Sequence, residues 1–171
     1  MTLEEAIRTA IEYEIRVRDT YAEAMAEATD EQGRKIFKVL ADEEQGHIDY
    51  LESRLQEWQK TGAITAAELK TAVPAPHVIE AGLEKLRGQM EETEKVYSGE
   101  LKMLRRALNV EIETGNFYRQ MVEELDGDGQ RMFARFLEIE NGHRALVQAE
   151  IDSVSGLGFW FDFPEFNLEQ A

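Results

Sequence analysis

Two distant stretches of this chain repeat the same order of residues. Residues 10–21 read AIEYEIRVRDTY and residues 107–118 read ALNVEIETGNFY, and in both a glutamate precedes a tyrosine by seven residues. Residues 44–47 and 140–143 repeat a second element, Glu-x-x-His. The offset is 97 residues for the first element and 96 for the second. The chain therefore contains an internal duplication, and we expect both halves to adopt the same fold.

Each half contains two segments in which apolar residues recur at spacings of three and four, the period of an amphipathic helix. Ala, Leu, Glu, Lys, Arg and Gln, which favour helix, are frequent throughout. We therefore expect an all-α fold in which two duplicated helix hairpins form a four-helix bundle. The expected single domain, 1–171, consists of a helix hairpin (1–60), a long crossover (61–97), a second hairpin (98–157) and an aromatic C-terminal tail (158–171).

Capping residues in the sequence predict where these helices begin. Thr2 and Glu5 predict a capping box at the start of the first helix, and Thr29 is the expected N-cap of the second. Within the crossover, the sequence favours a short helix over about residues 65–73 and another over about residues 77–96.

Composition excludes several classes of function. The formal net charge is −16, whereas nucleic-acid binding needs a basic face that replaces phosphate counterions, so we expect no nucleic-acid partner. No apolar stretch reaches the roughly 20 residues of a membrane span, and no basic and apolar leader follows Met1. We therefore expect a cytoplasmic protein without a membrane partner. The absence of cysteine excludes disulfides, thiolate zinc sites and iron–sulfur clusters, so oxygen and imidazole nitrogen must hold any metal.

Six titratable residues occupy helix positions that otherwise carry Leu, Ile, Phe or Ala: Glu14, Glu44, His47, Glu111, Glu140 and His143. An isolated buried carboxylate is costly, and four placed together would repel one another. Two divalent cations would balance the four carboxylates. Residues at i and i+3 share a helix face, so each Glu-x-x-His can reach the same pair of metals. The sequence therefore predicts a dinuclear metal centre inside the bundle.

Two tyrosines lie near this centre, and one histidine lies away from it. Tyr21 and Tyr118 are each two helical turns from a ligand glutamate, so their hydroxyls are candidates for hydrogen bonds to metal-bound carboxylates, with a purely packing role as the alternative. We expect no catalytic residue beyond the ligands themselves. His77 lies beside Pro76 in the crossover without a matching carboxylate pattern, and we assign it no role.

These residues resemble the ferritin-like superfamily, specifically the rubrerythrin-like di-iron carboxylate proteins, over about residues 1–60 and 98–154. A Glu from each of two helices plus Glu-x-x-His from the other two is the ligand pattern of ferritin-like proteins. The resemblance implies two iron ions, with manganese or zinc as alternatives. It also implies that Glu44 and Glu140 bridge the ions, that Glu14 with His47 completes one end, and that Glu111 with His143 completes the other.

The chain departs from rubrerythrins in two respects. Rubrerythrins carry a further carboxylate one turn after the third-helix glutamate, where this chain has Thr114, and Val17 is the matching residue of the first helix. The ligand set is therefore closer to that of bacterioferritin. Rubrerythrins also usually append a four-cysteine iron domain, which this chain cannot form, so an external electron donor is expected.

The resemblance implies a non-haem di-iron oxidoreductase that reduces hydrogen peroxide or dioxygen. The alternatives are a ferroxidase or iron-handling protein, and a structural metal-binding bundle without turnover. The aromatic tail and the acidic surface suggest a two-fold homodimer. The tail itself is expected either to fold back over its own bundle or to dock on a second subunit.

Overall fold

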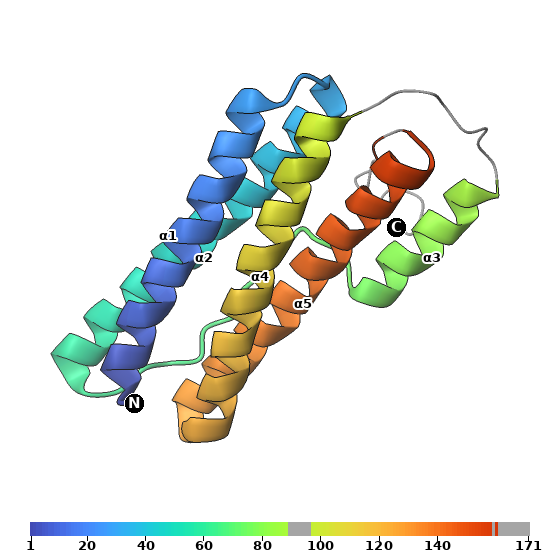
Figure 1. The fold of residues 1–171 in the computed structure, drawn as a ribbon. Coiled ribbons are helices and arrows are strands. Elements are labelled where there is room, and N and C mark those ends of the chain that lie inside the picture. Colours follow the sequence, from blue (N-terminus) through green and yellow to red (C-terminus); the bar gives the residue numbers. More distant parts are fainter. Residues whose placement is uncertain (89–96, 159, 161–171) are drawn as a thin grey trace.

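Four long helices form an antiparallel bundle, and a fifth, shorter helix lies beside it in the computed structural model, which describes residues 1–88, 97–158 and 160 (Figure 1). The helices are α1 (Leu3–Glu27), α2 (Glu31–Thr61), α3 (Pro76–Arg87), α4 (Ser98–Glu124) and α5 (Gly127–Gly156). The described residues contain no β-strand, so the expected all-α class is confirmed. Along these residues, no helix combines the length and the apolar character that crossing a bilayer requires.

The helix starts agree only partly with the sequence signals. Thr2 and Glu5 form the expected capping box of α1. The N-cap of α2 is Asp30 rather than Thr29, because the Asp30 carboxylate accepts hydrogen bonds from the first turn of that helix. Thr29 instead donates from its backbone N and its Oγ1 to Oε1 of Glu100, at 2.8 and 2.6 Å. A buried carboxylate of α4 thus holds the turn between α1 and α2.

Within the described residues of the crossover, 62–88 and 97, the structure has one helix, whereas the sequence predicts two. Residues 65–73 form no helix, and Thr65 donates to the Glu57 carboxylate of α2 instead of capping a new helix. This segment packs across the bundle, with Ile64 and Leu69 buried. Helix α3 then begins at Pro76 and ends at Arg87, beside α5, while residues 89–96 of the second expected helix lie outside the described part of the chain.

The core consists of two apolar clusters, one toward each end of the bundle. The first includes Tyr21, Phe37 and Leu104, and the second includes Leu51, Phe133 and Phe136. The six predicted ligands belong to neither cluster, although every one of them is buried. Polar residues in the middle of the bundle are therefore bounded by apolar side chains along its axis, which lowers the local dielectric and strengthens every charge interaction there.

Trp160 is the only residue of the tail beyond Gly158 that the structure describes. Its ring packs edge-on against Phe37, with ring centroids 5.5 Å apart, and is 6% exposed. Gly33 of α2 makes room for it, because a Cβ at Gly33 would lie 2.6 Å from the indole ring. At this position the tail folds back over its own bundle, and residues 161–171 lie outside the described part.

Candidate metal centre

The structure brings the six predicted ligands together at the centre of the bundle, one or two from each long helix. Glu14 comes from α1, Glu44 and His47 from α2, Glu111 from α4, and Glu140 and His143 from α5. All six are at most 1% exposed. The i, i+3 spacing on α2 and α5 aims each histidine at the carboxylates of the neighbouring helices.

Their donor atoms form two overlapping groups, each compact enough to hold a metal ion. One group contains Glu14, Glu44, His47 and Glu140, the other contains Glu44, Glu111, Glu140 and His143, and within each the donor atoms lie within 4.8 Å of one another. Glu44 and Glu140 belong to both groups. This is the arrangement that two metal ions would require if they shared two carboxylates. Each ion would also bind one further carboxylate and one imidazole.

Both histidines direct Nδ1 toward the carboxylates. Nδ1 of His47 lies 2.9 Å from Oε2 of Glu44 and 3.3 Å from Oε2 of Glu14. Nδ1 of His143 lies 2.8 Å from Oε1 of Glu44 and 3.8 Å from Oε1 of Glu111. The two imidazole rings are nearly parallel, at 7°, with their centroids 5.4 Å apart. Glu44 thus lies between the two histidines, as a bridging ligand would.

Several of these buried atoms make no hydrogen bond of good geometry with a described residue, although the two histidines lie at ion-pair distance from Glu44. They include both carboxylate oxygens of Glu44 and of Glu140, one oxygen of Glu111, and Nδ1 of His143. Buried polar atoms in folded proteins are nearly always satisfied, so a cluster of unsatisfied donors and acceptors indicates a missing partner. Every unsatisfied atom in this group is a competent metal ligand, and the residues therefore fit a pair of cations.

Burial and mutual repulsion shift the titration of the carboxyl groups in the metal-free cluster. Burial, together with the charge of Glu44, raises the pKa of Glu14 from 4.5 to about 8. Burial and the neighbouring carboxylates also raise the pKa of Glu140 well above its usual range. Glu44 differs, because the two histidines outweigh its burial and hold its pKa well below 4.5. Without metal, the cluster therefore keeps protons that metal ions would displace.

The histidines titrate in the opposite sense. Burial alone would lower the pKa of His47, but Glu44 and Glu14 outweigh burial and raise it from 6.5 to about 10. Burial likewise opposes the charged form of His143, and Glu44 with its neighbours raises the pKa of that imidazole well above 6.5. Imidazolium ions thus neutralise part of the carboxylate charge at the place where divalent cations would do so more strongly.

The two tyrosines bind the ligand carboxylates reciprocally across the bundle. The Tyr21 hydroxyl of α1 donates to Oε1 of Glu111 on α4, and the Tyr118 hydroxyl of α4 donates to Oε1 of Glu14 on α1. The sequence had placed each tyrosine near the glutamate of its own helix. In the structure each contacts the glutamate of the other half, so the two hydrogen bonds join the duplicated hairpins.

Glu43 is a contributor that sequence analysis missed. Its Oε2 lies 3.4 Å from Nε2 of His143, on the side of the ring that faces away from the ligand carboxylates. Thr71 Oγ1 and the backbone N of Ala72, both in the crossover, donate to the same carboxylate at 2.6 and 2.9 Å. Burial would raise the pKa of Glu43, but these donors and His143 hold it at about 2. A carboxylate behind a histidine fixes the orientation of the ring and makes it a better ligand.

The duplication explains why sequence analysis did not single out Glu43. Its equivalent in the second half is Ile139, so the residue is absent from the repeated pattern. Nε2 of His47 accordingly has no hydrogen-bond partner among the described residues, whereas Nε2 of His143 faces Glu43. Glu43 also forms a group with both histidines, whose donor atoms lie within 4.8 Å of one another, so the two ends differ in their hydrogen bonding rather than in whether a carboxylate is near.

The two positions that depart from rubrerythrins are buried, and neither supplies a carboxylate. Thr114 is fully buried, and its Oγ1 donates to the backbone O of Val110 at 2.9 Å, within its own helix. Val17 is fully buried in the first apolar cluster. His77 lies on α3 beside Glu80 and Glu84 and belongs to none of the metal-competent groups found among the described residues.

Comparison with known proteins returned no matching family model, no matching curated protein and no matching solved structure. The assignment of function therefore rests on the geometry and chemistry of the centre.

Proposed function

We propose that this chain is a rubrerythrin-like, non-haem di-iron oxidoreductase that reduces hydrogen peroxide or dioxygen. The observation that carries the proposal is the pair of metal-competent groups that share Glu44 and Glu140 in a buried layer of the bundle. Each group supplies carboxylate oxygens and one imidazole nitrogen, a donor set that suits iron, manganese or zinc and disfavours soft metals. Manganese and zinc therefore remain alternatives to iron.

Charge balance supports two divalent ions over one. Four ionised carboxylates in a low-dielectric layer repel one another strongly, and two divalent ions would neutralise them. Bound iron would supply the electrons and the Lewis acidity for reducing an oxygen–oxygen bond. The protein's own residues then hold the ligands in place and keep water out.

The residues around the ligands suit these tasks. Burial raises the pKa of Tyr21 and of Tyr118 well above 10, so that both hydroxyls keep their protons and donate to Glu111 and Glu14. A carboxylate held by such a donor keeps one oxygen directed at the metal position. The apolar clusters on either side include Phe37 and Phe136 and limit the access of water to the ligands.

A ferroxidase or iron-handling role is the second candidate, because the same two groups of ligands could bind ferrous iron as a substrate. The electrons for reducing an oxidant would then come either from a separate donor or from ferrous iron itself. A ferroxidase uses the second source. A structural site without turnover, most readily a zinc site, is the third candidate.

Loading the apoprotein with ferrous iron under anaerobic conditions tests these alternatives. We expect two irons per chain, measured by metal analysis after removal of free iron. The loaded protein is then mixed with dioxygen and, separately, with hydrogen peroxide, and the rates of iron oxidation are compared. Faster oxidation by peroxide supports a peroxide reductase, whereas faster oxidation by dioxygen with continued uptake of iron supports iron handling. Fewer than two irons per chain would contradict the dinuclear centre, and two bound irons that neither oxidant oxidises would contradict both redox functions.

A further inference from the structure

Glu43 and the two histidines form a third group of donor atoms, which shares its imidazoles with the dinuclear centre but has a carboxylate of its own. One oxygen of Glu43 and one ring nitrogen of each histidine lie within 4.8 Å of one another. Nε2 of His143 lies 3.4 Å from Oε2 of Glu43, and the buried Nε2 of His47 makes no hydrogen bond with a described residue. Two imidazoles and one carboxylate are a donor set that binds divalent iron or zinc in proteins.

The two nitrogens of each imidazole ring have different neighbours. Nδ1 of His47 and Nδ1 of His143 lie 2.9 and 2.8 Å from carboxylate oxygens of Glu44. A histidine that binds a metal through one nitrogen commonly directs its other nitrogen at a carboxylate, which fixes the ring. Glu44 lies at ion-pair distance from both Nδ1 atoms and orients both rings in this way. Nε2 of each ring is then the nitrogen available to a metal ion beside Glu43.

The crossover holds the Glu43 carboxylate next to these nitrogens. Oγ1 of Thr71 donates to Oε2 of Glu43 at 2.6 Å, and the backbone N of Ala72 donates to Oε1 at 2.9 Å. The side chain of Glu43 is 13% exposed, whereas the four carboxylates of the dinuclear centre are fully buried. An ion that arrives from solvent therefore meets Glu43 before it meets any of those four carboxylates.

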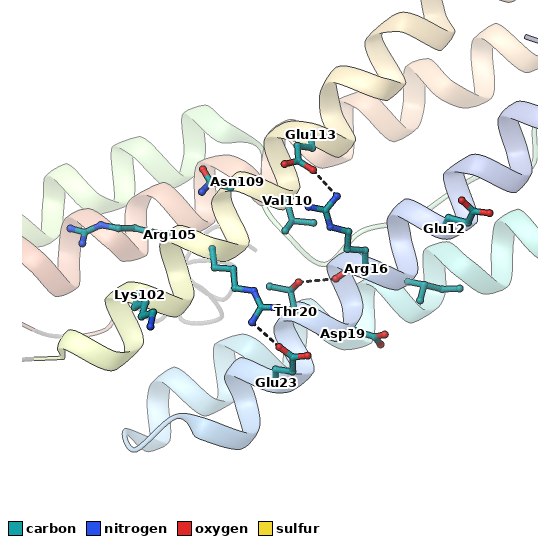
Figure 2. A pocket seen from close by; sticks show the side chains of 12 residues that line it. Glu12, Arg16, Asp19, Thr20, Glu23, Lys102, Arg105, Asn109, Val110 and Glu113 are labelled. Atoms are coloured by element: carbon teal, nitrogen blue, oxygen red, sulfur yellow. Dashed lines mark hydrogen bonds and ion pairs between the residues drawn. The ribbon is translucent and has the colours of Figure 1, made fainter.

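The acidic groove between α1 and α4 offers a cation no comparable set of ligands. It has a volume of about 780 Å³ and is lined by acidic and basic side chains of both helices, without a histidine (Figure 2). Glu113 and Glu23 are paired there with Arg16 and Arg106, at 2.6 and 2.8 Å. Among the described residues, every metal-competent group contains His47 or His143.

We propose that Glu43, Nε2 of His47 and Nε2 of His143 bind one divalent cation at an outer metal position, before that ion moves to the dinuclear centre. Binding at this position leaves both contacts between Nδ1 and Glu44 in place, whereas binding at the dinuclear centre replaces them. The outer position stands without the redox function proposed above, and only the transfer inward rests on the dinuclear centre.

The outer and inner modes of binding exclude one another. A neutral imidazole has one N–H donor and one nitrogen lone pair, so a ring that holds the outer ion through Nε2 cannot also hold an inner ion through Nδ1. On transfer, each ring loses the proton of Nδ1 and regains a proton at Nε2. Nε2 of His143 then faces Glu43 as a hydrogen-bond partner, as it does in the metal-free chain.

Cadmium NMR identifies the ring nitrogen that binds the first ion. The chain contains three histidines, so a ¹⁵N-histidine sample gives few signals, and His77 on α3 serves as an internal reference. Metal-free protein is titrated with ¹¹³Cd²⁺, whose coupling to ¹⁵N identifies the bonded nitrogen. At one ion per chain we expect a single cadmium signal that is coupled to Nε2 of both His47 and His143. Coupling to Nδ1, or to fewer than both Nε2 atoms, would overturn the proposal.

Glu43→Gln tests the carboxylate, because glutamine keeps the shape of the side chain and removes its charge. Binding of the first Cd²⁺ should weaken by about 10–100-fold in calorimetry, and this ion should couple to Nδ1 instead of Nε2. Asp42→Asn is the matched control, since it removes the same charge from the adjacent residue of α2, whose carboxylate pairs with Lys38. The control should bind the first ion as the wild type does. Equal weakening in both variants, with native helix content by circular dichroism, would show a general charge effect and overturn the proposal.

Further cadmium separates the outer position from the dinuclear centre. At two or more ions per chain, the coupling should move from Nε2 to Nδ1. Glu14→Gln with Glu111→Gln removes one carboxylate from each group of the dinuclear centre and leaves the outer ligands unchanged. This variant should keep the first ion at Nε2 without the later move to Nδ1, and loss of the first ion would overturn the outer position. A wild-type chain whose coupling never moves to Nδ1 would overturn the transfer inward.

Discussion

The metal-free protein should lose stability as the pH rises from about 5 to about 8, although folded proteins are commonly most stable in this range. The reason is the raised pKa of Glu14, which burial and the charge of Glu44 move from 4.5 to about 8. Between these two values the native carboxyl group holds a proton that the unfolded chain has released. A state that holds more protons is favoured at low pH, so unfolding becomes easier as protons become scarce.

The magnitude follows from the number of protons involved. One extra proton on the native state lowers the free energy of unfolding by about 1.4 kcal/mol per pH unit. Over three pH units, Glu14 alone therefore removes about 4 kcal/mol, a large part of the 5–15 kcal/mol typical of small proteins. Glu140, whose pKa burial and its neighbours also raise, acts in the same direction, and so does His47 above pH 6.5, because its pKa is raised to about 10.

Denaturant unfolding of chelator-treated protein at pH 5, 6.5 and 8 measures this slope. The Glu14→Gln variant is the control: it keeps an acceptor for the Tyr118 hydroxyl but cannot titrate, so its loss of stability with rising pH should be clearly shallower than that of the wild type. Adding metal should reverse the trend, because metal ions compete with protons and bind more tightly as the pH rises. A stability of the apoprotein that is constant or increases between pH 5 and 8 would refute the reasoning.

Three further predictions concern substitutions at the centre and in the core. Replacing Glu44 and Glu140 together with alanine should abolish binding of two metals per chain while the helices persist; metal analysis and circular dichroism check this, and retained binding would contradict the shared-ligand geometry. Glu43→Gln should weaken metal binding by about 10–100-fold in a competition titration, and unchanged affinity would show that this carboxylate plays no part. Gly33→Ala should destabilise the protein by about 1–3 kcal/mol in thermal melts and shift the fluorescence of displaced Trp160, whereas a wild-type spectrum and stability would contradict their close packing.

The long helices and the convergence of the ligands could be predicted because both depend on periodicity. A stripe at spacings of three and four fixes which face of a helix is buried, and the duplication fixes that Glu14 and Glu111 occupy equivalent positions. The apolar stripe and the duplication together predict that all six side chains point into the middle of the bundle. In the structure all six are buried there and lie close together. The ferritin-like relationship and the identity of the metal remain predictions.

Tertiary contacts determined the features that the sequence did not reveal. Thr29 carries a good capping side chain, but Glu100 of α4 binds it, and the adjacent Asp30 caps the helix instead. The sequence favours a helix over residues 65–73, yet the chain forms none there and instead connects α2 to α3, with Leu69 buried against the bundle. Glu43 lies one residue from a predicted ligand, and its role depends on the position of the opposite half, which no local pattern encodes.

The difference between Glu43 and Ile139 shows what joining the two hairpins in one chain makes possible. Two identical hairpins assembled as separate molecules would have to present the same side chain behind both histidines, because each position would be encoded once and used twice. In this chain the two positions are encoded separately, and only one of them has a carboxylate. Mutation can therefore change the residue behind one histidine without changing the residue behind the other. In the proposed di-metal centre, such unequal ends would let one metal position fill before the other.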